Sequence, residues 1–308
     1  MIIIIQFNKS QLPLFEEKKT TPISKTEELK KTKTKLKKIP SKTRVPKPVY
    51  KREIEGEKEI DKDDKFYETK TPPTITPVPR IKDVERKIGS KVIAVIIDDC
   101  GLNLEIIETF LELSDEFTFS ILPYLNESKK TAQFLHERNC QIMLHLPMEP
   151  EDILNNDPGP DALLVNLPKN TIKKRTLQAI NFVPYITGVN NHMGSKFTRN
   201  TELMQVVLEI IKQNSLFFVD SYTTPNSVAY QISKSMGIIT YKRDVFLDNY
   251  DALDDFELNL RKLIANAKSK GMAIGICHAK MQTVNNFKKS WHLLEDNNVQ
   301  LVRLSRFN

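Results

Sequence analysis

Cysteine is scarce in this sequence, and long apolar segments are missing. Three Cys among 308 residues are too few, and odd in number, for a disulfide-stapled scaffold. No run of eighteen apolar residues is present, so no complete membrane-spanning helix is expected. The motifs of phosphate-binding loops, CxxC redox sites, GxSxG hydrolases and HExxH proteases are also missing. A catalytic or metal site would therefore be built from Asp and His rather than from thiolates.

Positive charge is concentrated in the first third of the chain. The whole sequence has 46 Lys+Arg and 39 Asp+Glu, a formal net charge of +7. Residues 1–90 hold 23 basic and 14 acidic residues, a net charge of +9, so residues 91–308 carry 23 and 25, a net charge of −2. The basicity therefore belongs to an arm and says little about the substrate of the remaining chain.

Residues 1–90 are expected to form a disordered Lys/Pro/Thr-rich linker, because they contain too little apolar surface to offset the entropy of ordering. A solvated tether is the simplest interpretation, and contact with an anionic envelope is the alternative. Specific nucleic-acid binding is not expected, since aromatic residues are not interleaved with the basic ones. Residues 1–15 are compatible either with the remnant of a signal or anchor or with an apolar end of no function.

From residue 91 onward, short apolar runs alternate with amphipathic helical patterns. Residues 202–212, for example, place their apolar side chains on one helical face. This alternation predicts an α/β fold with a parallel sheet or barrel, whose active site would lie where strands end and loops begin. The expected strands are 92–97, 117–122, 141–144, 188–191, 216–219, 238–241, 272–276 and 299–304.

Polar residues follow these expected strands directly, and three of the five His are among them. Carboxylates and imidazoles at the ends of buried strands are costly unless they are paired or bind metal. Such residues therefore indicate a functional site at the carboxyl edge of the sheet. They are Asp98, Asp99, His145, Glu149, His192, Asp220, Asp244, Asp248 and His278.

The pair Asp98-Asp99 follows six apolar residues, which places it at the edge of a core. Adjacent side chains at a strand end point in opposite directions, so one carboxylate could bind a metal while the other acts as a base. Two turn residues before Gly101 are the simpler alternative.

Asp99, His145 and His192 together offer three N/O ligands, a set suited to catalytic Zn²⁺ with an open position. A hydrogen-bonded core histidine is the alternative for His145. Glu149 is a fourth possible ligand, or a carboxylate that accepts a hydrogen bond from one of the ligands.

His278 is expected at the mouth of the site, where it could act as a general acid. A histidine on a surface loop is the alternative. Asp220 is expected either to orient and charge His278 or to be structural. Asp244 and Asp248 are interpreted as loop caps or substrate contacts.

Seven motifs, in order, make residues 91–308 resemble the divergent polysaccharide deacetylase family, a branch of the carbohydrate esterase deacetylase superfamily. The resemblance covers about seventy per cent of the chain and implies a distorted (β/α) barrel of seven or eight strands and a metal-dependent amide hydrolase. The motifs are Ile96–Gly101, Leu122–Tyr124, His145–Glu149, Asp157–Pro160, Gly188–Ser195, Phe218–Thr223 and Arg243–Asn249.

The resemblance also implies roles for single residues. Asp98 corresponds to the catalytic base, Asp99 and His145 to metal ligands, and His278 to the acid.

Two positions depart from the wider superfamily. Glu149 stands where a second metal-binding His is usual, and His192 is the candidate to replace that ligand. The usual Gly-His-Pro around the acid is Cys277-His278-Ala279 here.

The expected function is removal of N-acetyl groups from an envelope polysaccharide or related N-acetylated glycan, with a divalent metal, Zn²⁺ by its ligands, in an extracytoplasmic location. The alternative is an inactive deacetylase-like envelope protein that binds glycan or acts as a scaffold. Glu149 and Ala279 favour the alternative, whereas the intact Asp-Asp pair and two His favour the enzyme. The oligomeric state has no signal in the sequence.

Overall fold

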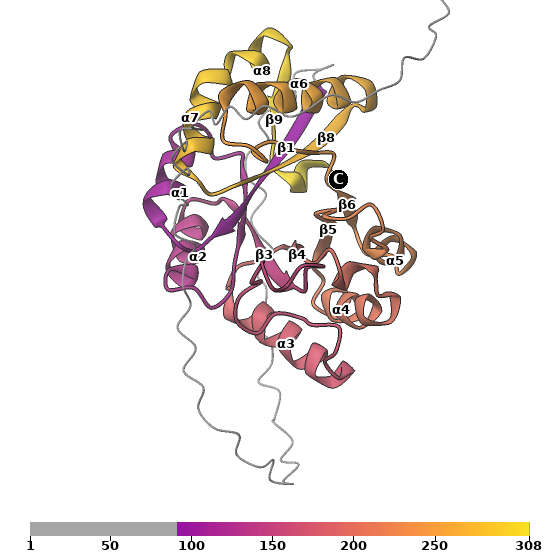
Figure 1. The fold of residues 1–308 in the computed structure, drawn as a ribbon. Helices are drawn as coiled ribbons and strands as arrows, with labels where there is room; N and C mark the ends of the chain where they lie inside the picture. Colours follow the sequence, from indigo (N-terminus) through magenta and orange to yellow (C-terminus); the bar gives the residue numbers. More distant parts are fainter. Residues whose placement is uncertain (1–90, 308) are drawn as a thin grey trace, which may run out of the picture. The chain divides into compact units, whose positions relative to one another are not determined.

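A computed structural model describes residues 91–307 (Figure 1). The predicted linker of residues 1–90, including the apolar end at 1–15, lies outside the described residues. Within the described part, no helix combines the length and apolar character needed to cross a bilayer.

The strands form one curved sheet in which every recorded pairing is parallel. Their order is β6-β5-β4-β3-β2-β1-β8-β7, with β9 paired to β1, and within residues 91–307 no pairing joins β6 to β7. The predicted distorted α/β barrel is therefore confirmed, in an open form. The strands are β1 Lys91–Cys100, β2 Thr118–Ile121, β3 Gln141–Met148, β4 Gly188–Met193, β5 Phe217–Asp220, β6 Thr240–Lys242, β7 Val245–Phe246, β8 Met272–His278 and β9 Val299–Leu301.

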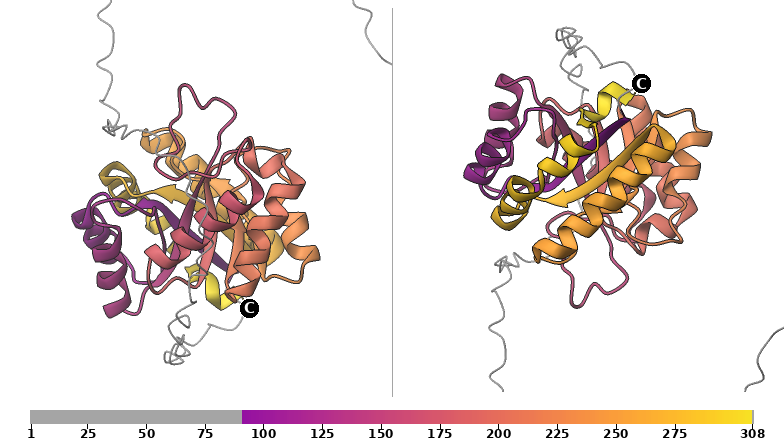
Figure 2. Two further views of the ribbon diagram at one scale, coloured as in Figure 1. Left: turned by 90° about the horizontal axis from the view of Figure 1, so that it is seen from below. Right: turned by 90° about the horizontal axis from the view of Figure 1, so that it is seen from above.

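The α-helices follow the strands in sequence and surround the convex face of the sheet (Figures 1 and 2). The pattern predicted at 202–212 is α4, as expected. The α-helices are α1 Leu104–Leu111, α2 Ser128–Glu137, α3 Lys169–Phe182, α4 Thr201–Gln213, α5 Ala229–Ser235, α6 Leu253–Lys270, α7 Met281–Ser290 and α8 His292–Asp296; the 3₁₀ turns are η1 Phe197–Arg199 and η2 Leu304–Phe307.

Strand β1 is buried on both faces, and its alternating side chains enter two separate cores. Ile93, Val95 and Ile97 pack in an outer cluster with the helices. The other set packs in an inner cluster that has no α-helical residue and is completed by the C-terminal segment. This inner cluster consists of Val92, Ala94, Ile96, Met143, Val219, Ile274, Ile276, Val302, Leu304 and Phe307.

Every second residue of β1 and β8 faces the inner side of the sheet, and these inner residues change from apolar to polar at the carboxyl edge. On β1 the series Val92, Ala94, Ile96 continues with Asp98, and on β8 Ile274 and Ile276 continue with His278. The floor of the barrel is therefore closed by apolar side chains, and the next inward positions hold the polar residues of the site.

Some predicted elements differ from the structure. Of the strand expected at 299–304, only Val299–Leu301 is a strand, and Leu304–Phe307 form a 3₁₀ turn. β7 was not expected, because two residues are too short for a periodic signal. The N-cap of α6 is Ala252, and Asp254 and Asp255 lie in its first turn, where carboxylates favour the positive end of the helix dipole. The helix ends before Gly271, which has φ 90°.

We predict that Phe117→Ala destabilises the fold by about 3–5 kcal/mol, the usual cost of a large-to-small change at an aromatic core position. Phe117 is fully buried and packs edge-on against Phe110 and Phe287 at 5.5 and 5.4 Å. Denaturant unfolding measures this loss. Leu154→Ala is the control, since Leu154 is 94% exposed and should change stability by less than about 0.5 kcal/mol. Equal losses in both variants would contradict this packing.

Candidate metal centre

Asp99, His145 and His192 converge at the carboxyl edge of the sheet, from β1, β3 and β4. His192 Nδ1 lies 3.1 Å from both Asp99 Oδ1 and His145 Nε2, and His145 Nε2 lies 3.4 Å from Asp99 Oδ1. One ligand atom from each residue therefore faces a common point.

Asp99 reaches this point through an irregular backbone. By strict alternation it would point away from the inner face that holds Asp98. The pairing of β1 with β2 shifts register between Ile97 and Cys100, and Asp99 has φ 60°, in the left-handed region that non-glycine residues seldom adopt. The expectation that the two carboxylates point in opposite directions is therefore wrong, since Asp98 Oδ2 and Asp99 Oδ1 both lie within 3.5 Å of His145 Nε2.

The three atoms fit a divalent cation. In tetrahedral coordination with bonds of about 2.0–2.1 Å, ligand atoms are about 3.3 Å apart, close to the three distances observed. Asp99 Oδ1 is buried and makes no hydrogen bond of acceptable geometry, although two imidazole nitrogens are near it. A buried carboxylate oxygen without such a bond is costly unless a cation compensates it. The His₂Asp donor set suits Zn²⁺.

The two neighbouring carboxyl groups differ in their electrostatics. Burial raises the pKa of Asp98, although the nearby His145 and His278 oppose this shift. Burial also acts against the ionised form of Asp99, but contacts with His145 and His192 hold the pKa of that carboxyl well below its ordinary value. Asp99 is therefore the carboxylate prepared to bind a cation, and Asp98 the one prepared to accept a proton.

His278 is held by Asp248, which follows β7. His278 Nδ1 lies 2.8 Å from Asp248 Oδ1, while Asp248 Oδ2 accepts from the His278 backbone N–H at 2.9 Å and from Thr283 Oγ1 at 2.7 Å. Burial disfavours the charged imidazole, but the hydrogen bond and charge of Asp248 outweigh it and raise the pKa of His278 to about 9. His278 is therefore protonated at neutral pH.

Asp220 lies elsewhere and has structural contacts. Its Oδ1 accepts from the Tyr222 N–H at 2.8 Å, and its Oδ2 accepts from Ser227 Oγ at 2.7 Å and the Tyr230 N–H at 3.2 Å. These bonds order the segment between β5 and α5. Of the two roles expected for Asp220, the contacts match the structural one, and Asp248 is the residue that orients His278.

Glu149 is not part of the metal cluster formed by the described residues. Its Oε1 pairs with Lys196 Nζ at 2.7 Å, and its Oε2 accepts from the Val165 N–H at 2.6 Å. The carboxylate thus ties the segment before α3 to the loop after β4. Asp244 also has a structural position, because it accepts from the Ile274 N–H and pairs with Lys270.

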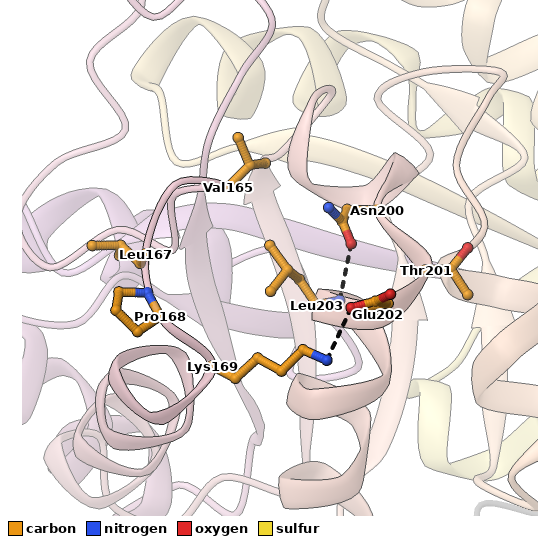
Figure 3. Close-up of a pocket in the computed structure, with 8 residues that line it drawn as sticks. All are labelled: Val165, Leu167, Pro168, Lys169, Asn200, Thr201, Glu202 and Leu203. Atoms are coloured by element: carbon orange, nitrogen blue, oxygen red, sulfur yellow. Dashed lines mark hydrogen bonds and ion pairs between the residues drawn. The ribbon is translucent and has the colours of Figure 1, made fainter.

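A separate hollow of about 660 Å³ lies at the start of α3 and α4 (Figure 3). Lys169 and Glu202 form an ion pair there at 2.9 Å, and Asn200 caps α4 through the Leu203 N–H. No residue of the metal cluster lines this hollow. The hollow offers no buried group with a shifted pKa, so the metal cluster is the stronger candidate for a functional site.

We predict that His192→Ala lowers zinc affinity more than about 100-fold. It removes one of three candidate ligands, and this should weaken binding more than the loss of a residue that only hydrogen-bonds to a ligand. Glu149→Gln should leave zinc affinity unchanged, since its carboxylate holds Lys196 and Val165. Competition with a chromogenic chelator measures both. A large loss in Glu149→Gln, with normal folding, would place Glu149 among the ligands.

We predict that Asp248→Asn lowers the pKa of His278 from about 9 towards its ordinary value of 6.5. Because the folded pKa is raised, the pair stabilises the fold fully below pH 6.5 and loses this effect as pH rises through 9. The stability difference between wild type and variant should therefore shrink over that range. NMR titration of the imidazole and unfolding at pH 6 and pH 10 test this. Thr283→Val, which leaves the carboxylate in place, is the control and should shift the pKa less.

The chain matches the family model described as divergent polysaccharide deacetylase over residues 95–307. The uncharacterized protein YibQ of Escherichia coli (strain K12) is 31% identical over 193 residues, which are 62% of this chain and 60% of that protein. An uncharacterized protein of Haemophilus influenzae (strain ATCC 51907 / DSM 11121 / KW20 / Rd) is 29% identical over 192 residues, 62% of this chain and 68% of that protein.

The fold has a counterpart among solved structures. The crystal structure of the uncharacterized protein ATU2773 from Agrobacterium tumefaciens C58 superposes with a TM-score of 0.69 at 22% identity, over 75% of this chain and 93% of that chain. The similarity of fold agrees with the family match, which covers most of the sequence. The chain belongs to the divergent polysaccharide deacetylase family.

Proposed function

We propose that this chain is a metal-dependent hydrolase that removes N-acetyl groups from an N-acetylated glycan of the cell envelope. The observation that supports this most is the arrangement of Asp99, His145 and His192 beside a buried carboxyl, Asp98, and a protonated imidazole, His278. Asp98 and His278 are direct neighbours in the pairing of β1 with β8. Acid, base and cation site thus lie at one edge of the sheet.

Asp99, His145 and His192 would hold the ion. A bound Zn²⁺ would supply Lewis-acid polarisation of the amide carbonyl and a lowered pKa for water.

Asp98 acts as the general base. It is 2% exposed, and burial raises its pKa, which brings its basicity closer to that needed at neutral pH. It accepts a proton as the water oxygen bonds to the acetamide carbonyl carbon.

His278 acts as the general acid. Its raised pKa keeps it protonated at neutral pH, and its side chain is 28% exposed, so a substrate can reach it. It donates its proton to the nitrogen as the C–N bond breaks, which releases acetate and a free amine. Asp248 stabilises the charged imidazole before the transfer and sets its orientation.

The family supports the substrate class and the location in this proposal. A polysaccharide deacetylase acts on N-acetylated sugars, and such polymers lie in the bacterial envelope, so an extracytoplasmic location is part of this proposal. Residues 1–90, with a net charge of +9, would there be attracted to anionic envelope polymers.

We predict that Asp99→Ala abolishes zinc binding and lowers acetate release from N-acetylglucosamine oligomers by at least about 100-fold. Asp254→Ala is the matched control, because Asp254 lies in the exposed first turn of α6 and should keep both properties.

Wild-type protein that binds zinc and glycan but releases no acetate would instead support an inactive glycan-binding or scaffold protein. Unaltered release after Asp99→Ala would contradict a metal-dependent reaction.

A further inference from the structure

We propose that Asn190 is the positioning residue of this site: its single amide selects the metal-binding tautomer of His145 and fixes the direction of Asp98. The inference rests on the proposed metal-dependent function and names the side chain that joins the ligand to the base. Asn190 is fully buried on β4, where its Cα is paired in register with that of His145 on β3.

Every hydrogen-bonding capacity of the Asn190 side chain is used. Its Oδ1 lies 2.9 Å from His145 Nδ1 and accepts from Ser120 Oγ. Its Nδ2 donates to Asp98 Oδ1 at 2.9 Å and to Ser221 Oγ at 3.1 Å. A primary amide has two donor hydrogens and two acceptor lone pairs, so no further hydrogen-bond partner can be accommodated. A fully satisfied buried network of this kind is rigid.

The neighbours determine which way the amide faces. An ionised Asp98 can only accept, so the NH₂ group must point towards it. The amide oxygen then faces His145 Nδ1, and that nitrogen must carry the proton in order to donate. A flipped amide would place its oxygen against the Asp98 carboxylate and its NH₂ group against the Nδ1 proton, and both contacts would be repulsive.

The consequence for His145 is a defined tautomer. With the proton on Nδ1, the neutral ring has its free lone pair on Nε2. Nε2 is the atom that faces Asp99 Oδ1 and His192 Nδ1 at 3.4 and 3.1 Å. Asn190 therefore directs the lone pair of His145 Nε2 at the cation site, although Asn190 itself makes no contact with that site.

The same amide also holds the base. Asp98 Oδ1 is directed to Asn190, while Asp98 Oδ2 faces His145 Nε2 at 3.5 Å. Movement of the amide would displace the ligand and the base together. Asn190 is thus a positioning residue that couples two groups on β1 and β3.

Two substitutions separate these tasks. Asn190→Leu has a similar size and removes both contacts, so zinc affinity should fall about 10–100-fold, the usual effect of losing the partner of a metal-binding His. Asn190→Asp keeps an oxygen acceptor for His145 Nδ1 but offers Asp98 a carboxylate in place of an N–H. It should keep zinc affinity within about tenfold of wild type, while kcat for acetate release falls.

The direct readout is NMR of protein labelled with ¹⁵N-histidine and loaded with ¹¹³Cd²⁺. In wild type, the cadmium coupling of His145 is expected at Nε2 and the ring proton at Nδ1, and Asn190→Asp should keep this pattern. In Asn190→Leu the Nδ1 proton should lose its protection from exchange. Cadmium on Nδ1 in wild type, or an Asn190→Leu protein that folds with unchanged tautomer and zinc affinity, would overturn the proposal.

Asn191→Asp is the matched control. Asn191 is the adjacent buried amide, but its bonds go to the Met193 carbonyl and the Ser221 N–H. It should leave the His145 tautomer intact, and an effect equal to that of Asn190→Leu would indicate general loosening and overturn the proposal.

A metal-free sample at alkaline pH, where His145 is neutral, reports its tautomer independently. Failure of wild type to bind any metal would sink the proposed function, whereas a proton on Nε2 in this sample would sink the role of Asn190.

Discussion

The burial of one carboxyl group, Asp98, is the constraint on which the site depends. A carboxylate that is 2% exposed is costly unless its oxygens meet donors or positive charge. Asn190 on β4 donates to Asp98 Oδ1, while Asp98 Oδ2 faces the candidate cation site beside His145 Nε2 on β3, so the register of three strands is tied to one side chain. The same burial raises the pKa of Asp98, which brings the carboxylate closer to the basicity that proton transfer at neutral pH needs.

Much of this arrangement follows from strand periodicity. The inner positions of β1 and β8 run from apolar residues to Asp98 and His278, so the sequence alone places both at the carboxyl edge. Asn190 obeys the same rule, but an Asn near a strand end resembles an ordinary turn residue. Its importance comes from contacts with residues 45 and 92 positions away, which no local pattern reveals.

Other features depend on pairing choices that a sequence leaves open. Asp220 ends β5 and Asp248 follows β7, and only the position of β7 beside β8 decides which one meets His278. Glu149 follows β3 as a ligand would, but Lys196 lies close enough to neutralise it. Asp99 turns inward because of a register shift and a positive φ, neither of which has a reliable sequence signal at a non-glycine residue.

In the open barrel, the residues of the candidate cation site and the partner of His278 lie on strands with different support. Asp98, His145 and Asn190 belong to strands with neighbours on both sides, whereas Asp248 follows β7, a two-residue strand at the end of the sheet. Mutations at that edge can alter the proposed acid while the candidate cation site persists. Drift at Asn190 alters ligand and base in a single step. If the proposed function holds, descendants of such a protein would lose catalysis most readily by the first route, and would retain a barrel with a cation site available for another use.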